Sequence, residues 1–186
     1  MPTPVFLTVD TELIWRHHAD GRDLADIYDR SFEPAGVGVG YQLARLHDHG
    51  LKATFFVDPM PALVYGLDPI KRVVAAILEA GQEVQLHLHP NWTAASAADR
   101  QAYARFNLTQ YDRDEQQALI AGARDLLIAA GAPCPIAFRA GNYAANADTL
   151  DALSALGFDY DSSHNGSMQP ALSMIDLAPE QIAPVA

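Results

Sequence analysis

The chain has 186 residues, 49% of them hydrophobic, and carries 23 acidic against 12 basic side chains for a formal net charge of -11. A chain of this length and composition can bury a core without disulfides, so we expect one globular domain over residues 1–186. The negative charge repels phosphate backbones, and this excludes nucleic acid as an expected partner. Cys134 is the only cysteine, and no apolar stretch resembles a signal peptide or a transmembrane helix. We therefore expect a cytoplasmic protein with no membrane insertion.

Short apolar runs rich in Val, Ile and Phe alternate with helical patterns along the chain. The runs that predict β-strands are residues 5–10, 53–58, 83–89, 136–139 and 158–161. Strands that alternate with helices are typical of a parallel sheet with crossover helices. The sequence therefore predicts the α/β class.

Four segments between these strands have helical periodicity: residues 36–49, 68–80, 112–130 and 146–156. In the second of them Asp68 is expected to be the N-cap, with Pro69 in the first turn and Gly81 beyond the end. Residues 20–31 and 91–111 are polar and are expected to be long loops at the carboxyl edge of the sheet, where ligands bind in α/β folds.

Two strands end in pairs of polar residues at a spacing of two. Asp10 and Glu12 follow the first strand, and His87 and His89 follow the third. Because strand side chains alternate between faces, the members of each pair point the same way. The apolar residues expected on the opposite face are Val5, Leu7, Val9, Val84, Leu86 and Leu88. Carboxylates and imidazoles at one edge predict a site for zinc, iron, manganese, cobalt or nickel, although either pair alone could cap a loop or lie in a polar pocket.

Two more motifs follow the later strands. Arg139, within Phe-Arg-Ala-Gly-Asn, ends the fourth strand and is expected to pair with Asp10 through two parallel hydrogen bonds; a surface salt bridge is the alternative. Asp161 and His164 lie in Tyr-Asp-Ser-Ser-His after the fifth strand, where an ordinary Asp/Ser turn is the alternative.

These four pieces together resemble the polysaccharide deacetylase family, which has the NodB-homology domain of carbohydrate esterase family 4. The matching stretches are T-V-D-T-E at 8–12, H-L-H-P-N at 87–91, F-R-A-G-N at 138–142 and Y-D-S-S at 160–163. The resemblance implies a distorted (β/α) barrel of the TIM type, a bound divalent cation and hydrolysis of an acetamido group. It looks closest to a variant branch with D-x-E and H-x-H in place of the common D-D and H-x-x-x-H patterns.

By this resemblance Asp10 is the catalytic base. The family's second carboxylate, a metal ligand, would fall at Thr11, which cannot serve as an anionic ligand. We therefore assign that role to Glu12.

His87 matches the first metal-binding histidine of the family. The second would fall at Asn91, so either His89 replaces it or Asn91 supplies a weaker oxygen ligand. Imidazole binds transition metals better than an amide does, which favours His89, and the expected ion is zinc.

The family usually supplies a general acid from a late histidine motif that this sequence does not contain. His164 is the expected substitute, with Asp161 beside it among the catalytic candidates; His17 and His18 are weaker candidates. Only five strands are clear, with a sixth predicted at residues 182–185. We therefore expect a truncated barrel, an incomplete barrel or one completed by another subunit of a homo-oligomer.

The resulting hypothesis is a metal-dependent hydrolase that removes an N-acetyl group from a sugar or a cell-surface polysaccharide precursor. The nearest alternative is a hydrolase of cyclic amides or ureides. The alternative from another class is an inactive carbohydrate-binding or scaffold protein. The expected partner is an N-acetylated sugar or another small amide substrate.

Overall fold

The sheet contains five parallel strands in sequential order, β1-β2-β3-β4-β5, in a computed structural model that describes residues 5–96, 98–100, 105–164 and 174–177. The strands are β1 (Thr8–Thr11), β2 (Thr54–Val57), β3 (Glu83–Leu88), β4 (Ala137–Ala140) and β5 (Tyr160–Asp161). Each corresponds to one of the five predicted runs, so the α/β class with a parallel sheet is confirmed. The sixth strand predicted at 182–185 lies outside the described residues.

Four helices confirm the helical segments predicted from periodicity: α3 (Val39–Asp48), α5 (Asp68–Glu79), α6 (Arg113–Ala129) and α7 (Ala147–Ala155). The structure adds α1 (Trp15–Ala19), α2 (Leu24–Phe32) and α4 (Ala62–Tyr65). Short 3-10 turns are η1 (Pro34–Gly36), η2 (Pro90–Ala94), η3 (Leu108–Gln110) and η4 (Gly141–Tyr143). No helix in the described part of the chain is long and apolar enough to cross a membrane.

The prediction of a polar loop over residues 20–31 is wrong. The side chain of Asp23 caps α2 by accepting from the backbone N–H of Asp26, and Ile27 and Phe32 are buried on the inner face of the helix. Leu24, Ile27 and Tyr28 have helical spacing with charged residues between them, so the segment is amphipathic and its helix was predictable.

The predicted N-cap of α5 is also wrong by one residue. Leu67 is the N-cap, and Asp68 is the first helical residue, with no side-chain capping bond. Pro69 in the first turn explains the early start, because its fixed φ suits that position. Asp68 then acts on the helix through its charge in the first turn.

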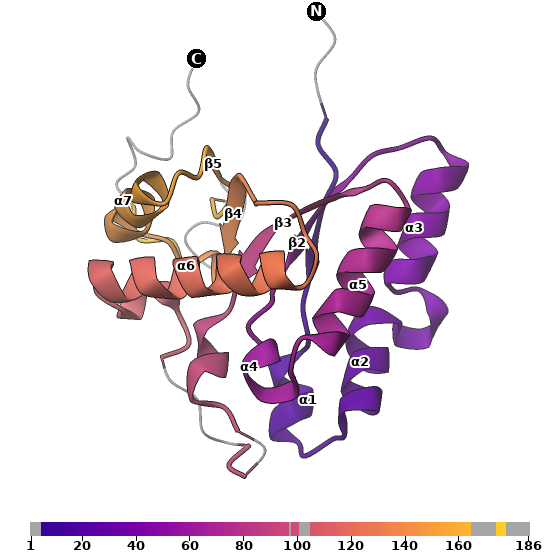
Figure 1. Cartoon of the computed structure of the whole chain (residues 1–186), viewed down its shortest axis with the longest axis horizontal. Helices are drawn as coiled ribbons and strands as arrows, with labels where there is room; N and C mark the ends of the chain where they lie inside the picture. The colour runs from indigo at the N-terminus through magenta and orange to yellow at the C-terminus, as the bar shows by residue number, and fades with distance from the viewer. Residues whose placement is uncertain (1–4, 97, 101–104, 165–173, 178–186) are drawn as a thin grey trace, which may run out of the picture.

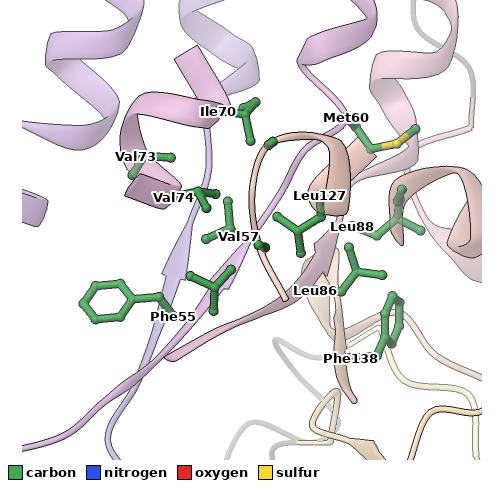
Figure 2. Close-up of a cluster of buried hydrophobic side chains, with 14 of the residues drawn as sticks. Phe55, Val57, Met60, Ile70, Val73, Val74, Leu86, Leu88, Leu127 and Phe138 are labelled. Atoms are coloured by element: carbon green, nitrogen blue, oxygen red, sulfur yellow. The ribbon is translucent and has the colours of Figure 1, made fainter. Parts of the chain in front are cut away.

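Helices cover one face of the sheet because successive strands add to the same edge through crossover connections. Helix α5 packs on β3 and beside α3, while α6 also contacts β3 and packs on α7 (Figure 1). Figure 2 shows the core between these layers, with Val57 of β2 and Leu86 of β3 near Val74 of α5 and Leu127 of α6. Sequential parallel strands with helices outside are the arrangement of a (β/α) barrel wall.

Alternation along the strands separates an apolar face from a polar one. Val84, Leu86 and Leu88 are buried against the helices, as predicted. Val5 and Leu7, which were expected on this face, precede β1 and are 80% and 40% exposed, whereas Val9 packs partly on the core. In the described part of the chain β1 pairs only with β2, so its beginning lies at an open edge.

Candidate metal centre and active site

The carboxyl ends of β1 and β3 bring one carboxylate and two imidazoles together. Ligand atoms of Glu12, His87 and His89 all lie within 4.8 Å of one another. Glu12 Oε2 lies 2.5 Å from His89 Nε2 and 3.8 Å from His87 Nε2. Both predicted pairs therefore contribute to one cluster, with Glu12 as the member from the first pair.

A hydrogen bond to the backbone fixes the orientation of the His87 ring. Its Nδ1 lies 2.7 Å from the backbone carbonyl oxygen of Arg139. Because a carbonyl oxygen only accepts, Nδ1 carries the proton, and the Nε2 lone pair is directed toward Glu12. A backbone carbonyl in this position is the usual support of a metal-binding histidine.

The charges within the cluster are unequal. Burial, together with the charge of His89, lowers the pKa of His87 to about 4, so this imidazole is neutral near pH 7. Burial opposes the charged form of both other members, but their mutual hydrogen bond and charges raise the pKa of His89 and lower that of Glu12. The ionised Glu12 carboxylate and the protonated His89 imidazole therefore favour each other. A divalent cation at this cluster would meet two nitrogen ligands and one oxygen ligand.

Asp10 forms a separate pair with Arg139, as the sequence predicted, but through one hydrogen bond instead of two parallel ones. Arg139 Nη1 donates to Asp10 Oδ1 at 2.6 Å, and Nη2 donates to Thr8 Oγ1 at 3.0 Å and Ser162 Oγ at 2.8 Å. The guanidinium also lies 4.2 Å from the ring centroid of Phe56. Arg139 is only 8% exposed, so the alternative of a surface salt bridge is wrong. The Asp10 carboxylate is fixed in direction at the same end of the sheet as the cluster.

Asp161 makes the contacts of an Asp/Ser turn. Its Oδ1 accepts from the Ser163 hydroxyl at 2.6 Å, and the same hydroxyl accepts from the Ala140 N–H at 2.9 Å. These bonds join the ends of β4 and β5, and burial raises the pKa of Asp161. His164 is half-buried, and its Nδ1 has no hydrogen-bond partner within the described residues. The catalytic roles expected of Asp161 and His164 stay predictions.

Asn91 and His18, two further candidates from the sequence, lie in different settings. Asn91 is buried, its side-chain oxygen has no partner within the described residues, and it shares a pocket with Glu12 and His89. His18 is buried, with Nδ1 2.6 Å from the Tyr65 hydroxyl oxygen and its ring against Trp92. These contacts favour a structural role for His18 over that of a general acid.

Two residues near the cluster were missed by the sequence analysis. Asp58 at the end of β2 is fully buried, accepts a hydrogen bond from the Met60 N–H, and has its pKa raised to about 7 by burial. Gly141 begins η4 and lies against the His89 ring, so a Cβ at this position would collide with that ring. Both residues carried a signal in the sequence. Asp58 is an acid at the end of a buried central strand, and Gly141 is a glycine two residues after an arginine at a strand end.

The contact between Gly141 and His89 predicts the effect of one methyl group. We expect Gly141→Ala to displace the His89 ring and to weaken zinc binding by about tenfold or more, because supporting contacts of metal ligands typically contribute 10–100-fold. Competition with a chromogenic chelator measures the affinity.

Gly122→Ala is the matched control, since Gly122 lies in α6 with open space around its Cα. That change should leave zinc affinity unaltered and stabilise the fold by about 0.5–1 kcal/mol. Equal zinc affinities of the two variants would refute the role assigned to Gly141.

Comparisons with known proteins identify the family of this chain. The sequence model of the family described as polysaccharide deacetylase matches residues 39–160, which is more than half of the chain. The chain therefore belongs to the polysaccharide deacetylase family. No curated protein sequence matches it.

Solved structures of low sequence identity show the same fold. A family 4 carbohydrate esterase from Streptomyces lividans, solved with acetate, is 19% identical with a TM-score of 0.52; the match covers 84% of this chain and 60% of that one. A Mycobacterium smegmatis protein described as a polysaccharide deacetylase is 22% identical with a TM-score of 0.58, covering 84% of this chain and 49% of that one. A family 4 pseudoenzyme from Bacillus anthracis is 15% identical with a TM-score of 0.52, covering 84% and 41%. The chain thus spans less than two thirds of each of these proteins.

Proposed function

We propose that this chain is a metal-dependent hydrolase that removes the N-acetyl group from a sugar or a cell-surface polysaccharide precursor. The observation that carries the proposal is the Glu12, His87 and His89 cluster beside the Asp10 and Arg139 pair. Family membership supports amide hydrolysis as the reaction, because the family is described by its deacetylase activity.

Glu12, His87 and His89 would hold the metal. Asn91 is the alternative to His89 and would supply an oxygen ligand in its place. Zinc suits two imidazoles and one carboxylate best, with iron, cobalt, nickel or manganese as alternatives. A bound divalent ion supplies positive charge that polarises the acyl carbonyl and lowers the pKa of water.

Asp10 is proposed as the general base. Its carboxylate accepts a proton from water as the water oxygen bonds to the acetyl carbon, and the carbon–nitrogen bond then breaks to leave acetate and the sugar amine. Arg139 holds Asp10 Oδ1, which leaves the other carboxylate oxygen for the proton. The departing nitrogen needs a proton, and His164 is the proposed donor, as an imidazole beyond β5 with an unpartnered Nδ1 among the described residues.

The direct experiment measures acetate release from N-acetylglucosamine derivatives by the protein loaded with zinc, and again after chelation. We expect release with metal and none without it. Ring opening of cyclic imides or allantoin without acetate release would favour the cyclic amide hydrolase. Retained sugar binding with neither reaction would favour the inactive carbohydrate-binding protein.

Metal binding is expected to weaken as the pH falls. The pKa of His89 is raised, so its proton competes with the metal below that pKa, whereas His87, with a pKa of about 4, is already neutral. Below the pKa of His89 and above about pH 5 the logarithm of zinc affinity should therefore change by about one unit per pH unit. Chelator competition across this range gives the slope.

Asp58 could add to this slope because its pKa is about 7. Asp58→Asn removes that titration without removing a proposed ligand, and we expect the variant to keep a slope near one. A slope of about two in the variant would mean that both histidines release a proton, contrary to the account of His87.

A further inference from the structure

A pocket of about 330 Å³ adjoins the proposed metal centre and includes Glu12 and His89 in its wall. Trp15 and Phe106 supply aromatic surface, with the buried Trp92 behind them, and Asn91 adds a buried side-chain oxygen with no partner within the described residues. Small-molecule sites span about 300–1,000 Å³, so this volume suits a ligand of monosaccharide size. Aromatic walls with a few polar groups suit a sugar ring, which has both apolar faces and hydroxyl edges.

Arg16 is the cation of this pocket. It is exposed on α1, lines the pocket, and makes no side-chain hydrogen bond or ion pair with the part of the chain that the structure describes. Every other arginine has a partner among the described residues. Carboxylates pair with most of them, the Tyr28 ring lies under Arg72, and the Arg22 carbonyl oxygen accepts from Arg100.

Acidic side chains outnumber basic ones by 23 to 12, so an arginine with no partner among the described residues stands out. The net charge of -11 opposes the approach of an anionic ligand, so a site for such a ligand needs local positive charge. A guanidinium binds phosphate or carboxylate through two parallel hydrogen bonds and stays charged at any physiological pH.

We propose that the substrate is an N-acetylated sugar that carries an anionic group, and that Arg16 pairs with this anion while the sugar lies in the pocket beside Glu12 and His89. This inference rests on the proposed deacetylase function, and it narrows the substrate class. Arg16 is a specificity residue, and the cluster and Asp10 are the catalytic groups.

The test measures binding of three probes to the zinc-loaded protein by calorimetry: N-acetylglucosamine, its 1-phosphate, and N-acetylglucosaminuronic acid. We expect at least one anionic sugar to bind about tenfold more tightly than the neutral sugar, as a charge-assisted pair predicts. The preference of phosphate over carboxylate, or the reverse, identifies the anion. Raised salt should reduce this difference in affinity between the anionic and the neutral sugar.

Arg16→Ala should remove this advantage, so that the anionic sugars bind no more tightly than neutral N-acetylglucosamine. Arg113→Ala is the matched control, because it removes the same charge from an exposed position on α6 where Arg113 lies 4.0 Å from Asp151. That control should keep the full preference for the anionic sugar.

Acetate release is measured on the same probes, so the two proposals fail separately. Tight binding of an anionic sugar that depends on Arg16, without acetate release, would uphold the pocket and refute the deacetylase. Equal binding of all three probes, an unchanged preference in Arg16→Ala, or no binding of any probe would overturn the role of Arg16.

Discussion

Asp10→Asn should abolish turnover while leaving the metal bound. The amide cannot accept the proton of water as the carboxylate does, and positioned general bases contribute about 10²–10⁴-fold, so we expect kcat to fall about 10³-fold. The asparagine oxygen can still accept from Arg139 Nη1, which keeps the local geometry. Acetate release and metal content are measured on the same sample.

Asp151→Asn makes the same chemical change at an exposed position on α7 and should keep full activity. An Asp10→Asn variant with near wild-type kcat would refute the assignment of the base. Loss of metal in Asp10→Asn would instead make Asp10 a ligand.

Arg139→Met should reduce both stability and activity. The change leaves Asp10 without its cation and removes bonds to Thr8 and Ser162 that join β1, β4 and the end of β5. Breaking a fully buried ion pair destabilises by about 3–5 kcal/mol, but the Asp10 side chain is 34% exposed, so solvent screening brings our expectation to about 2 kcal/mol. Activity should fall about 10²-fold or more, because a small misplacement of the base has this effect.

Urea unfolding and acetate release check this prediction. Arg124→Met is the control, since Arg124 pairs with Asp125 at the surface, and its unfolding free energy should change by less than about 0.5 kcal/mol. A fully stable Arg139→Met protein would show that the bonds of Arg139 contribute little to the fold.

Much of the fold follows from local patterns. Period-two and helical spacing predicted the five strands and four of the helices, because their apolar faces pack on one core. Helix α2 has apolar residues at helical spacing, and the polar composition of its segment outweighed that signal in the prediction. The short helices α1 and α4 offer too few positions for any periodicity.

Part of the candidate site was predictable because the carboxyl ends of parallel strands meet at one edge of the sheet. That rule places Glu12, His87 and His89 together and brings Arg139 to Asp10. Alternation along β1 also directs Thr11, which is 2% exposed, away from the face that carries Glu12. The importance of three other residues depends on what surrounds them in the fold, which no spacing rule predicts. These residues are Gly141, Asp58 and Arg16.

Metal stoichiometry tests the central claim most directly. The protein is stripped with a chelator, loaded with zinc, passed through a desalting column and analysed for metal. The wild type should retain about one zinc ion per chain, whereas His87→Ala and Glu12→Gln should retain almost none. His49→Ala, which changes the C-cap residue of α3, should behave as the wild type. A wild type without zinc, or a His87→Ala variant with a full equivalent, would contradict the account.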